Sequence, residues 1–166
     1  MSYDIYFVRR DPGQTFADAL DATEESYGGD PSPLGSAQLE QWERITTRAR
    51  QVLDGVEEFA TDAKSRELSD AATGIQLSMI ADEVSITVPS ERPDQDPDAL
   101  MAKVYALARV VESETGLEGY DPQLQEPITD PAQRLAAPAP RSAASTTEPA
   151  PAQPSGGRPW WKFWKW

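Results

Sequence analysis

The last nine residues of the chain, 158–166, combine cationic and aromatic side chains in a pattern that suits contact with an apolar or anionic surface. They contain four of the five tryptophans in the sequence. Projected at about 100° per residue, the cations fall on one side of a helix and most of the aromatic rings on the other. The expected contact residues are Arg158, Trp160, Trp161, Lys162, Phe163, Trp164, Lys165 and Trp166.

This segment is too short to form a stable helix on its own, so we expect it to become ordered only on contact. Aromatic rings favour the headgroup boundary of a bilayer, and each cation near an anionic leaflet contributes about 1 kcal/mol. In composition, residues 158–166 resemble the tryptophan-rich cationic antimicrobial peptides, and this resemblance implies insertion into anionic bilayer interfaces. Docking in an apolar groove of a partner protein, or on the chain's own acidic part, stays open.

The charge of the chain is distributed unevenly. Residues 131–166 hold five cationic side chains against one acidic side chain, a net charge of +4, which leaves −17 of the total of −13 on residues 1–130. So acidic a body repels nucleic-acid phosphates, and we expect no nucleic-acid partner. A basic protein, masked by the acidic surface, is an alternative partner.

The sequence contains neither cysteine nor histidine. Disulfides, thiol nucleophiles and imidazole bases are therefore excluded, together with the commonest metal ligand. Catalysis would need paired carboxylates, so a carboxylate-based hydrolase is the lower alternative. Asp94, Asp96 and Asp98 alternate as in a calcium loop, but Ala99 stands where that loop needs glycine and Tyr105 where it needs glutamate. We expect a non-enzymatic protein that uses no cofactor or metal.

Two short motifs lie near the two ends of the expected domain. The first is the run SYDIYF at residues 2–7, and the second is the run YDPQ at residues 120–123. They resemble a pattern of small uncharacterised bacterial proteins, some of which look like immunity proteins of toxin systems. The resemblance covers roughly residues 2–123, and it implies no established activity.

If the two terminal strands pair, the motifs form a candidate polar patch. Its members are Asp4, Tyr6, Tyr120, Asp121 and Gln123. The favoured interpretation is structural instead. It places Tyr120 in the core, together with Tyr3, Ile5 and Phe7, and the Asp121–Pro122 pair in a turn.

The elements that must position these residues follow the apolar periodicity. A strand is expected over residues 3–8, and then a short helix capped by Thr15. A longer helix begins at Ser36, and its apolar positions continue as far as Phe59. Residues 61–73 are polar and are expected to form a loop, in which Leu68 could anchor a short strand or turn.

The second half of the domain has clearer signals. Alternating residues at 75–79 and 84–88 predict a β-hairpin with one buried face. Asp96 as N-cap, Pro97 at the first position and Gly116 after the end bracket a third helix, which a strand at 117–121 follows. The order β-α-α-β-β-α-β predicts an α+β fold, with a small mixed or antiparallel sheet and helices on one face.

The expected organisation is an acidic domain at residues 1–130, a disordered linker rich in proline and alanine at 131–157, and the contact segment at 158–166. The first residues lack the apolar stretch of a secretory signal, and no run approaches the roughly 18 apolar residues of a spanning helix. We expect a cytoplasmic interaction protein that associates reversibly with the inner face of the membrane or with a membrane-bound partner.

Overall fold

The computed structural model describes residues 2–26, 31–89 and 95–128 of the chain. The predicted linker and the predicted contact segment lie outside the described residues. The elements follow in the order β1 (Ser2–Val8), α1 (Phe16–Ser26), α2 (Ser36–Val52), β2 (Val56–Phe59), β3 (Ser65–Asp70), β4 (Gln76–Ile80), β5 (Glu83–Pro89), α3 (Pro97–Thr115), β6 (Glu118–Asp121) and β7 (Glu126–Pro127).

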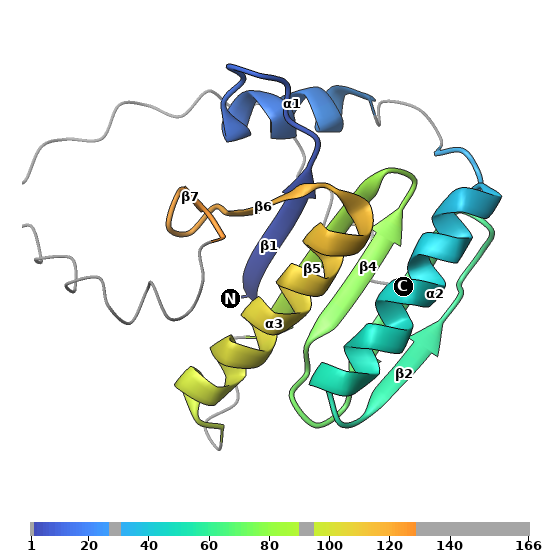
Figure 1. Ribbon diagram of the computed structural model, residues 1–166, viewed down its shortest axis with the longest axis vertical. Helices are drawn as coiled ribbons and strands as arrows, with labels where there is room; N and C mark the ends of the chain where they lie inside the picture. The colour runs from blue at the N-terminus through green and yellow to red at the C-terminus, as the bar shows by residue number, and fades with distance from the viewer. Residues whose placement is uncertain (1, 27–30, 90–94, 129–166) are drawn as a thin grey trace, which may run out of the picture.

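The strands form one antiparallel sheet of seven strands in the order β2-β3-β4-β5-β1-β6-β7. Figure 1 shows α2 and α3 side by side over one face of this sheet, and α1 across its end. The predicted α+β class is confirmed, and the sheet is the antiparallel one of the two types expected.

The core lies between the sheet and the two long helices. Because alternate residues of a strand point to the same face, β1, β3, β4 and β5 contribute side chains from alternating positions to this layer. The strands supply Ile5, Phe7, Leu68, Leu77, Met79, Val84, Ile86 and Val88, and the helices supply Trp42, Ile45, Ala49, Val104, Leu107 and Val111. All of these side chains are buried, and each large one stabilises the fold by about 1.5–3 kcal/mol relative to exposure.

The hairpin and the third helix are confirmed in detail. β4 and β5 pair so that Leu77 lies opposite Ile86, with both side chains buried. The side chain of Asp96 accepts a hydrogen bond from the backbone N–H of Asp98 at 3.1 Å, and α3 begins at the following proline. Gly116 ends the helix in the left-handed conformation, at φ 70°, which glycine adopts without strain.

Two predictions in the middle of the chain are wrong. The helix that begins at Ser36 ends at Val52, and residues up to Phe59 form β2 instead. Asp70 pins the intervening turn, because its side chain accepts a hydrogen bond from the backbone N–H of Gly55 at 2.8 Å. Val56 and Phe59 keep the helical spacing by coincidence.

The expected loop at 61–73 contains β3, which pairs with β2 and with β4. Its residues alternate correctly for a half-buried strand, but Leu68 is the only apolar side chain among the three that face the helices. Arg66 and Asp70 occupy the other two inward positions. The apolar alternation that would have predicted the strand is therefore absent, although Leu68 does anchor it.

Candidate functional site

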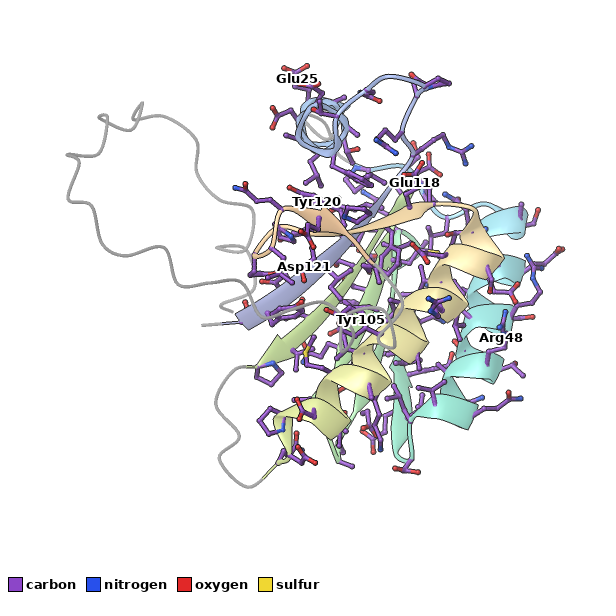
Figure 2. All side chains as sticks on the ribbon, turned by 60° about the vertical axis from the view of Figure 1, so that its left-hand side comes forward. Glu25, Arg48, Tyr105, Glu118, Tyr120 and Asp121 are labelled. Carbon is purple, nitrogen blue, oxygen red and sulfur yellow. The ribbon has the colours of Figure 1, made fainter. Side chains whose placement is uncertain are left out.

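The predicted polar patch is divided between the two faces of the sheet. β1 and β6 do pair, and their register places Tyr6 opposite Tyr120. Asp4 shares that face, because it lies two residues from Tyr6 on the same strand. Asp121, labelled with Tyr120 in Figure 2, projects from the opposite face and is fully buried. Gln123 lies in the turn that follows.

Tyr120 is not a core residue, contrary to the structural interpretation of the sequence. Its ring stacks on Phe16 of α1, with centroids 4.7 Å apart and an interplanar angle of 11°. The guanidinium of Arg10 lies 4.3 Å above the Phe16 ring and forms a salt bridge with Glu118 at 2.8 Å. This stack fixes α1 at the end of the sheet. The turn expected at Asp121–Pro122 begins one residue later: Asp121 ends β6, and residues 122–125 form the turn.

Asp121 receives hydrogen bonds on both carboxylate oxygens. The hydroxyl of Tyr3 donates to Oδ2, and the backbone N–H groups of Gln123 and Leu124 donate to Oδ1 at 3.0 and 3.2 Å. The hydroxyl of Tyr105 on α3 lies 3.4 Å from that of Tyr3. A buried carboxylate needs such donors to offset its lost hydration. Asp121 therefore ties the β6–β7 turn to β1 and α3.

A second buried carboxylate, Asp70, has the corresponding role at the other side of the sheet. Besides Gly55, the backbone N–H and the hydroxyl of Thr73 donate to it, at 3.1 and 2.5 Å. Burial by itself raises the pKa of Asp70, but the hydrogen bonds from Thr73 and Gly55 outweigh it and hold the pKa below its ordinary value. Both carboxylates hold loops in place through these hydrogen bonds.

The face of the sheet opposite α2 and α3, which we call the open face, carries small polar side chains across its centre. One row crosses all seven strands, as the pairing registers show: Phe59, Glu67, Ser78, Ser85, Tyr6, Tyr120 and Pro127. The hydroxyls of the two central serines hydrogen-bond to each other at 2.9 Å. A parallel row holds Glu57, Ser69, Gln76, Thr87 and Asp4. Together the rows place hydroxyl groups in the middle of the open face.

The charged residues at described strand positions of the open face are all acidic. Its described strand positions include Asp4, Glu57, Glu67 and Glu83, and Glu118 beside them is the partner of Arg10. No lysine or arginine occupies a strand position on this face within the described residues. Burial among neighbouring side chains raises the pKa of Glu67. We call the four residues from Asp4 to Glu83 the acidic set.

The sequence did not reveal this surface, because it depends on two strands that were not predicted. Glu57 and Glu67 come from β2 and β3, and in the sequence they are two acidic residues among many. A weak signal was present in Ser65, Glu67 and Ser69, which alternate along β3. Only the register across several strands shows that these residues share a surface with Asp4, some sixty positions earlier.

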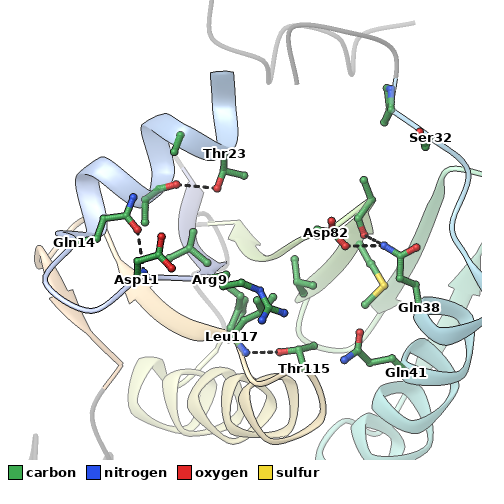
Figure 3. A pocket seen from close by; sticks show the side chains of 18 residues that line it. Arg9, Asp11, Gln14, Thr23, Ser32, Gln38, Gln41, Asp82, Thr115 and Leu117 are labelled. Carbon is green, nitrogen blue, oxygen red and sulfur yellow. Dashed lines mark hydrogen bonds between the residues drawn. The ribbon is translucent and has the colours of Figure 1, made fainter. Parts of the chain in front are cut away.

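A cavity of about 620 Å³ lies at the end of the sheet, between α1, the β4–β5 turn, the start of α2 and the end of α3 (Figure 3). Its size falls in the range of small-molecule sites. Phe7 and Met79 contribute to its apolar part, whereas Arg9, Asp11 and Asp82 bring charges of both signs. This mixed lining does not select a ligand of one charge.

The predicted contact residues from Arg158 to Trp166 lie outside the described residues, so their role stays a prediction. Within the described ranges, no helix is long and apolar enough to cross a membrane. Nor does any group of three or more acidic side chains in those ranges gather closely enough to hold a metal ion. No protein-family model, curated protein or solved structure matches the chain.

Proposed function

We propose that the chain is a non-enzymatic interaction protein whose C-terminal segment, residues 158–166, associates reversibly with an anionic membrane surface or with a membrane-bound partner. The observation that carries this proposal is an opposition within one chain. The domain is acidic, on its open face as in its total charge, while the segment joins three cations to four tryptophans. The segment combines the cations and aromatic rings that suit an anionic bilayer.

The length of chain between the domain and the segment supports separate roles for the two. Residues 129–157 separate the last described residue, Ile128, from the segment. A flexible chain of that length spans roughly 30 Å. The Debye length at physiological salt is about 8 Å, so an acidic domain held that far from the bilayer feels little repulsion from it. The domain would be the cargo or adaptor that the segment brings to the membrane.

The expected affinity is modest. Arg158, Lys162 and Lys165 contribute about 1 kcal/mol each near an anionic leaflet, and ordering the segment offsets part of the gain from burying the aromatic rings. Binding should therefore be reversible, and it should weaken as salt screens the cations.

Co-sedimentation of the full chain with phosphatidylglycerol–phosphatidylcholine vesicles tests this. The variant with Trp160, Trp161, Trp164 and Trp166 changed to alanine should lose most of its vesicle binding, because the rings supply the apolar contact. The variant R158Q/K162Q/K165Q should lose the dependence on anionic lipid. R134Q/R141Q, which removes two cations from residues 131–157, is the control and should bind nearly as the unchanged chain does. Equal sedimentation of all four proteins would contradict the proposal.

A second candidate function is the binding of a basic protein to the open face, as an immunity-like or regulatory module would bind it. The specific observation in its favour is the acidic set, which shares its face with no cationic strand residue in the described part of the chain. Such complementarity accelerates association and selects basic partners. A basic partner isolated with the full chain should be lost from the variant E57Q/E67Q/E83Q and retained by E25Q/E40Q/E43Q, which removes the same charge from exposed helix positions.

A further inference from the structure

We propose that the open face of the sheet is a docking site for the chain's own C-terminal segment, residues 158–166. Docking needs no membrane, so it goes beyond the proposed function and would compete with it. The occupant is part of the same chain, and three properties of the open face support this choice: its shape, its charge and its distance from the point where the described chain ends.

The shape of the open face suits flat aromatic rings. Ser78 and Ser85, the second with 6% of its surface exposed, leave the centre of the long row low between Glu67 on one side and Tyr6 on the other. Phe59 stands beyond Glu67, with 47% of its surface exposed. An indole ring lying on the serines would have the Tyr6 ring on one side and the Glu67 carboxylate on the other. Its N–H is a donor only, and hydroxyl and carboxylate oxygens in the same rows are acceptors.

The charge of the open face complements that of the segment. Glu57 and Glu67 belong to the neighbouring strands β2 and β3 at one edge of the sheet, and Glu83 belongs to the central strand β5. The segment carries three cations and no acidic side chain. Opposite charges brought together on a partly buried surface attract more strongly than they do in water, and salt weakens the attraction.

The segment can present both kinds of side chain to this face if it is extended. In a strand, residues 160, 162, 164 and 166 share one side, which places three tryptophans and Lys162 together. In a helix, the cations and the rings separate onto opposite sides, as a bilayer interface requires. Docking and membrane insertion would therefore use different conformations and could not occur at once.

The connection has the right length. Ile128 lies at the β7 edge of the sheet, where its N–H donates to the carbonyl of Gly119 at 2.9 Å. With strands about 4.8 Å apart, five spacings place β3 roughly 24 Å from β7. A flexible chain of the length of residues 129–157 would span roughly 30 Å, which covers this distance, and a tether that matches the span gives effective concentrations in the millimolar range. A contact within one chain is therefore favoured over one between copies.

Acrylamide quenching of tryptophan fluorescence in the full chain, without vesicles, tests docking directly. Four of the five tryptophans belong to the segment, and the fifth, Trp42, is buried with 3% exposed and gives a constant background. At low salt the segment should be protected, and 0.5 M salt should raise the quenching constant about twofold. The variant E57Q/E67Q/E83Q should show the high quenching already at low salt.

The matched control is E25Q/E40Q/E43Q, which removes three exposed glutamates from α1 and α2 and leaves the open face intact. It should keep the protection of the unchanged chain. K162E/K165E changes only the segment, and so it tests docking without altering the domain; it should also lose protection. Adding E57K and E67K to it should restore protection in part.

Three results would overturn docking within the chain. One is equal low-salt quenching in the unchanged chain and in both E57Q/E67Q/E83Q and K162E/K165E. Another is an equal loss of protection in the control E25Q/E40Q/E43Q, which would indicate attraction to total charge alone. The third is protection that grows with protein concentration, which would indicate contact between copies.

Vesicle binding separates this inference from the proposed function. If both hold, E57Q/E67Q/E83Q binds anionic vesicles more tightly than the unchanged chain, because competition by the open face is gone. If only the proposed function holds, the two proteins bind vesicles equally and neither protects its segment at low salt. If only docking holds, neither binds vesicles, and the difference in quenching remains.

Discussion

The two faces of the sheet are built by the same strands and have opposite chemistry. The face under α2 and α3 gathers large apolar side chains, such as Leu77 and Ile86, which the helices cover. The open face gathers hydroxyl groups and carboxylates. Ser78, for example, follows Leu77 in the sequence, and Glu67 lies opposite Ser78 on the neighbouring strand. Along β4, buried side chains therefore alternate with exposed or half-buried ones, and substitutions at adjacent positions of this strand should have very different effects.

The carboxylates of the two faces differ in the same way. Asp70, on the covered face, is surrounded by hydrogen-bond donors that lower its pKa despite burial. Glu67, on the open face, has its pKa raised by burial among its neighbours. The fold therefore favours the charged form of Asp70 and disfavours the charged form of Glu67. A carboxylate disfavoured in this way gains from a cation that binds to it.

The largest difference between the faces should appear on β4. Leu77→Ala removes a fully buried side chain and should lower the free energy of unfolding by about 3 kcal/mol, through lost burial and the cavity left behind. Ser78→Ala, one residue further on, removes one hydrogen bond and should cost about 0.5 kcal/mol. Urea denaturation of the two variants measures both. Similar losses in the two variants would mean that the faces are not distinct.

The next largest effect concerns the buried carboxylate of the covered face. Asp70→Asn replaces a charged acceptor facing Gly55 and Thr73 and should lower the free energy of unfolding by about 2 kcal/mol at pH 7. Because the pKa of Asp70 in the folded chain lies below its ordinary 3.8, its stabilisation is present above pH 3.8 and is lost as the pH falls through the lowered value. Denaturation between pH 7 and 2.5 should show the two proteins converging in acid. A constant difference over that range would exclude a charged anchor.

A smaller effect is expected where the covered face meets the end of the described chain. A Cβ atom on Gly119 would lie 2.4 Å from Cδ1 of Ile128 and 3.1 Å from Cε1 of Phe7. Gly119→Ala should therefore lower the free energy of unfolding by about 1 kcal/mol, since Ile128 must move. Ile128→Val removes the nearer atom, so the double variant should recover part of the loss relative to Ile128→Val alone. Thermal unfolding compares the four proteins, and no recovery would place the strain elsewhere.

The sequence predicted those elements whose apolar periodicity and end signals agree. The hairpin alternates strictly, with Leu77 opposite Ile86, and α3 has Asp96, Pro97 and Gly116 at its ends. β3 failed because two of its inward positions hold Arg66 and Asp70, which lie among hydrogen-bonding partners rather than in an apolar layer. Such a strand forms because other parts of the fold pair and hydrogen-bond with it, and the periodicity of a single sequence does not reveal those partners.

The candidate sites also differ in how far the sequence alone predicts them. The composition of residues 158–166 is visible in the sequence, because clustered tryptophans and cations need no fold to be recognised. The patch around Tyr6 was predicted on the condition that the terminal strands pair, and they do, but alternation along β6 sends Asp121 to the other face. The acidic set was not predicted, since it depends on the register of β2 and β3.

The smallest expected effect tests the open face itself. The pKa of Glu67 is raised above 4.5, so the stability associated with its protonated form is present below pH 4.5 and is lost as the pH rises through the raised value. Glu67→Gln should therefore be more stable than the unchanged chain at pH 7, by no more than about 0.5 kcal/mol, and the gain should vanish below pH 4.5. Denaturation curves at pH 7 and pH 4 measure the difference.

Measuring the stability of Glu67→Gln and of the unchanged chain at low and at high salt makes this test more specific. At 0.5 M salt the C-terminal segment is screened from the open face, so the cost of burying the Glu67 charge should be seen by itself. At low salt, cations docked beside Glu67 would favour its ionised form, and the advantage of Glu67→Gln should shrink or reverse. An advantage independent of salt would show that nothing cationic rests on this carboxylate. A lower stability of Glu67→Gln at high salt would show that the fold itself uses the charge, as it does at Asp70.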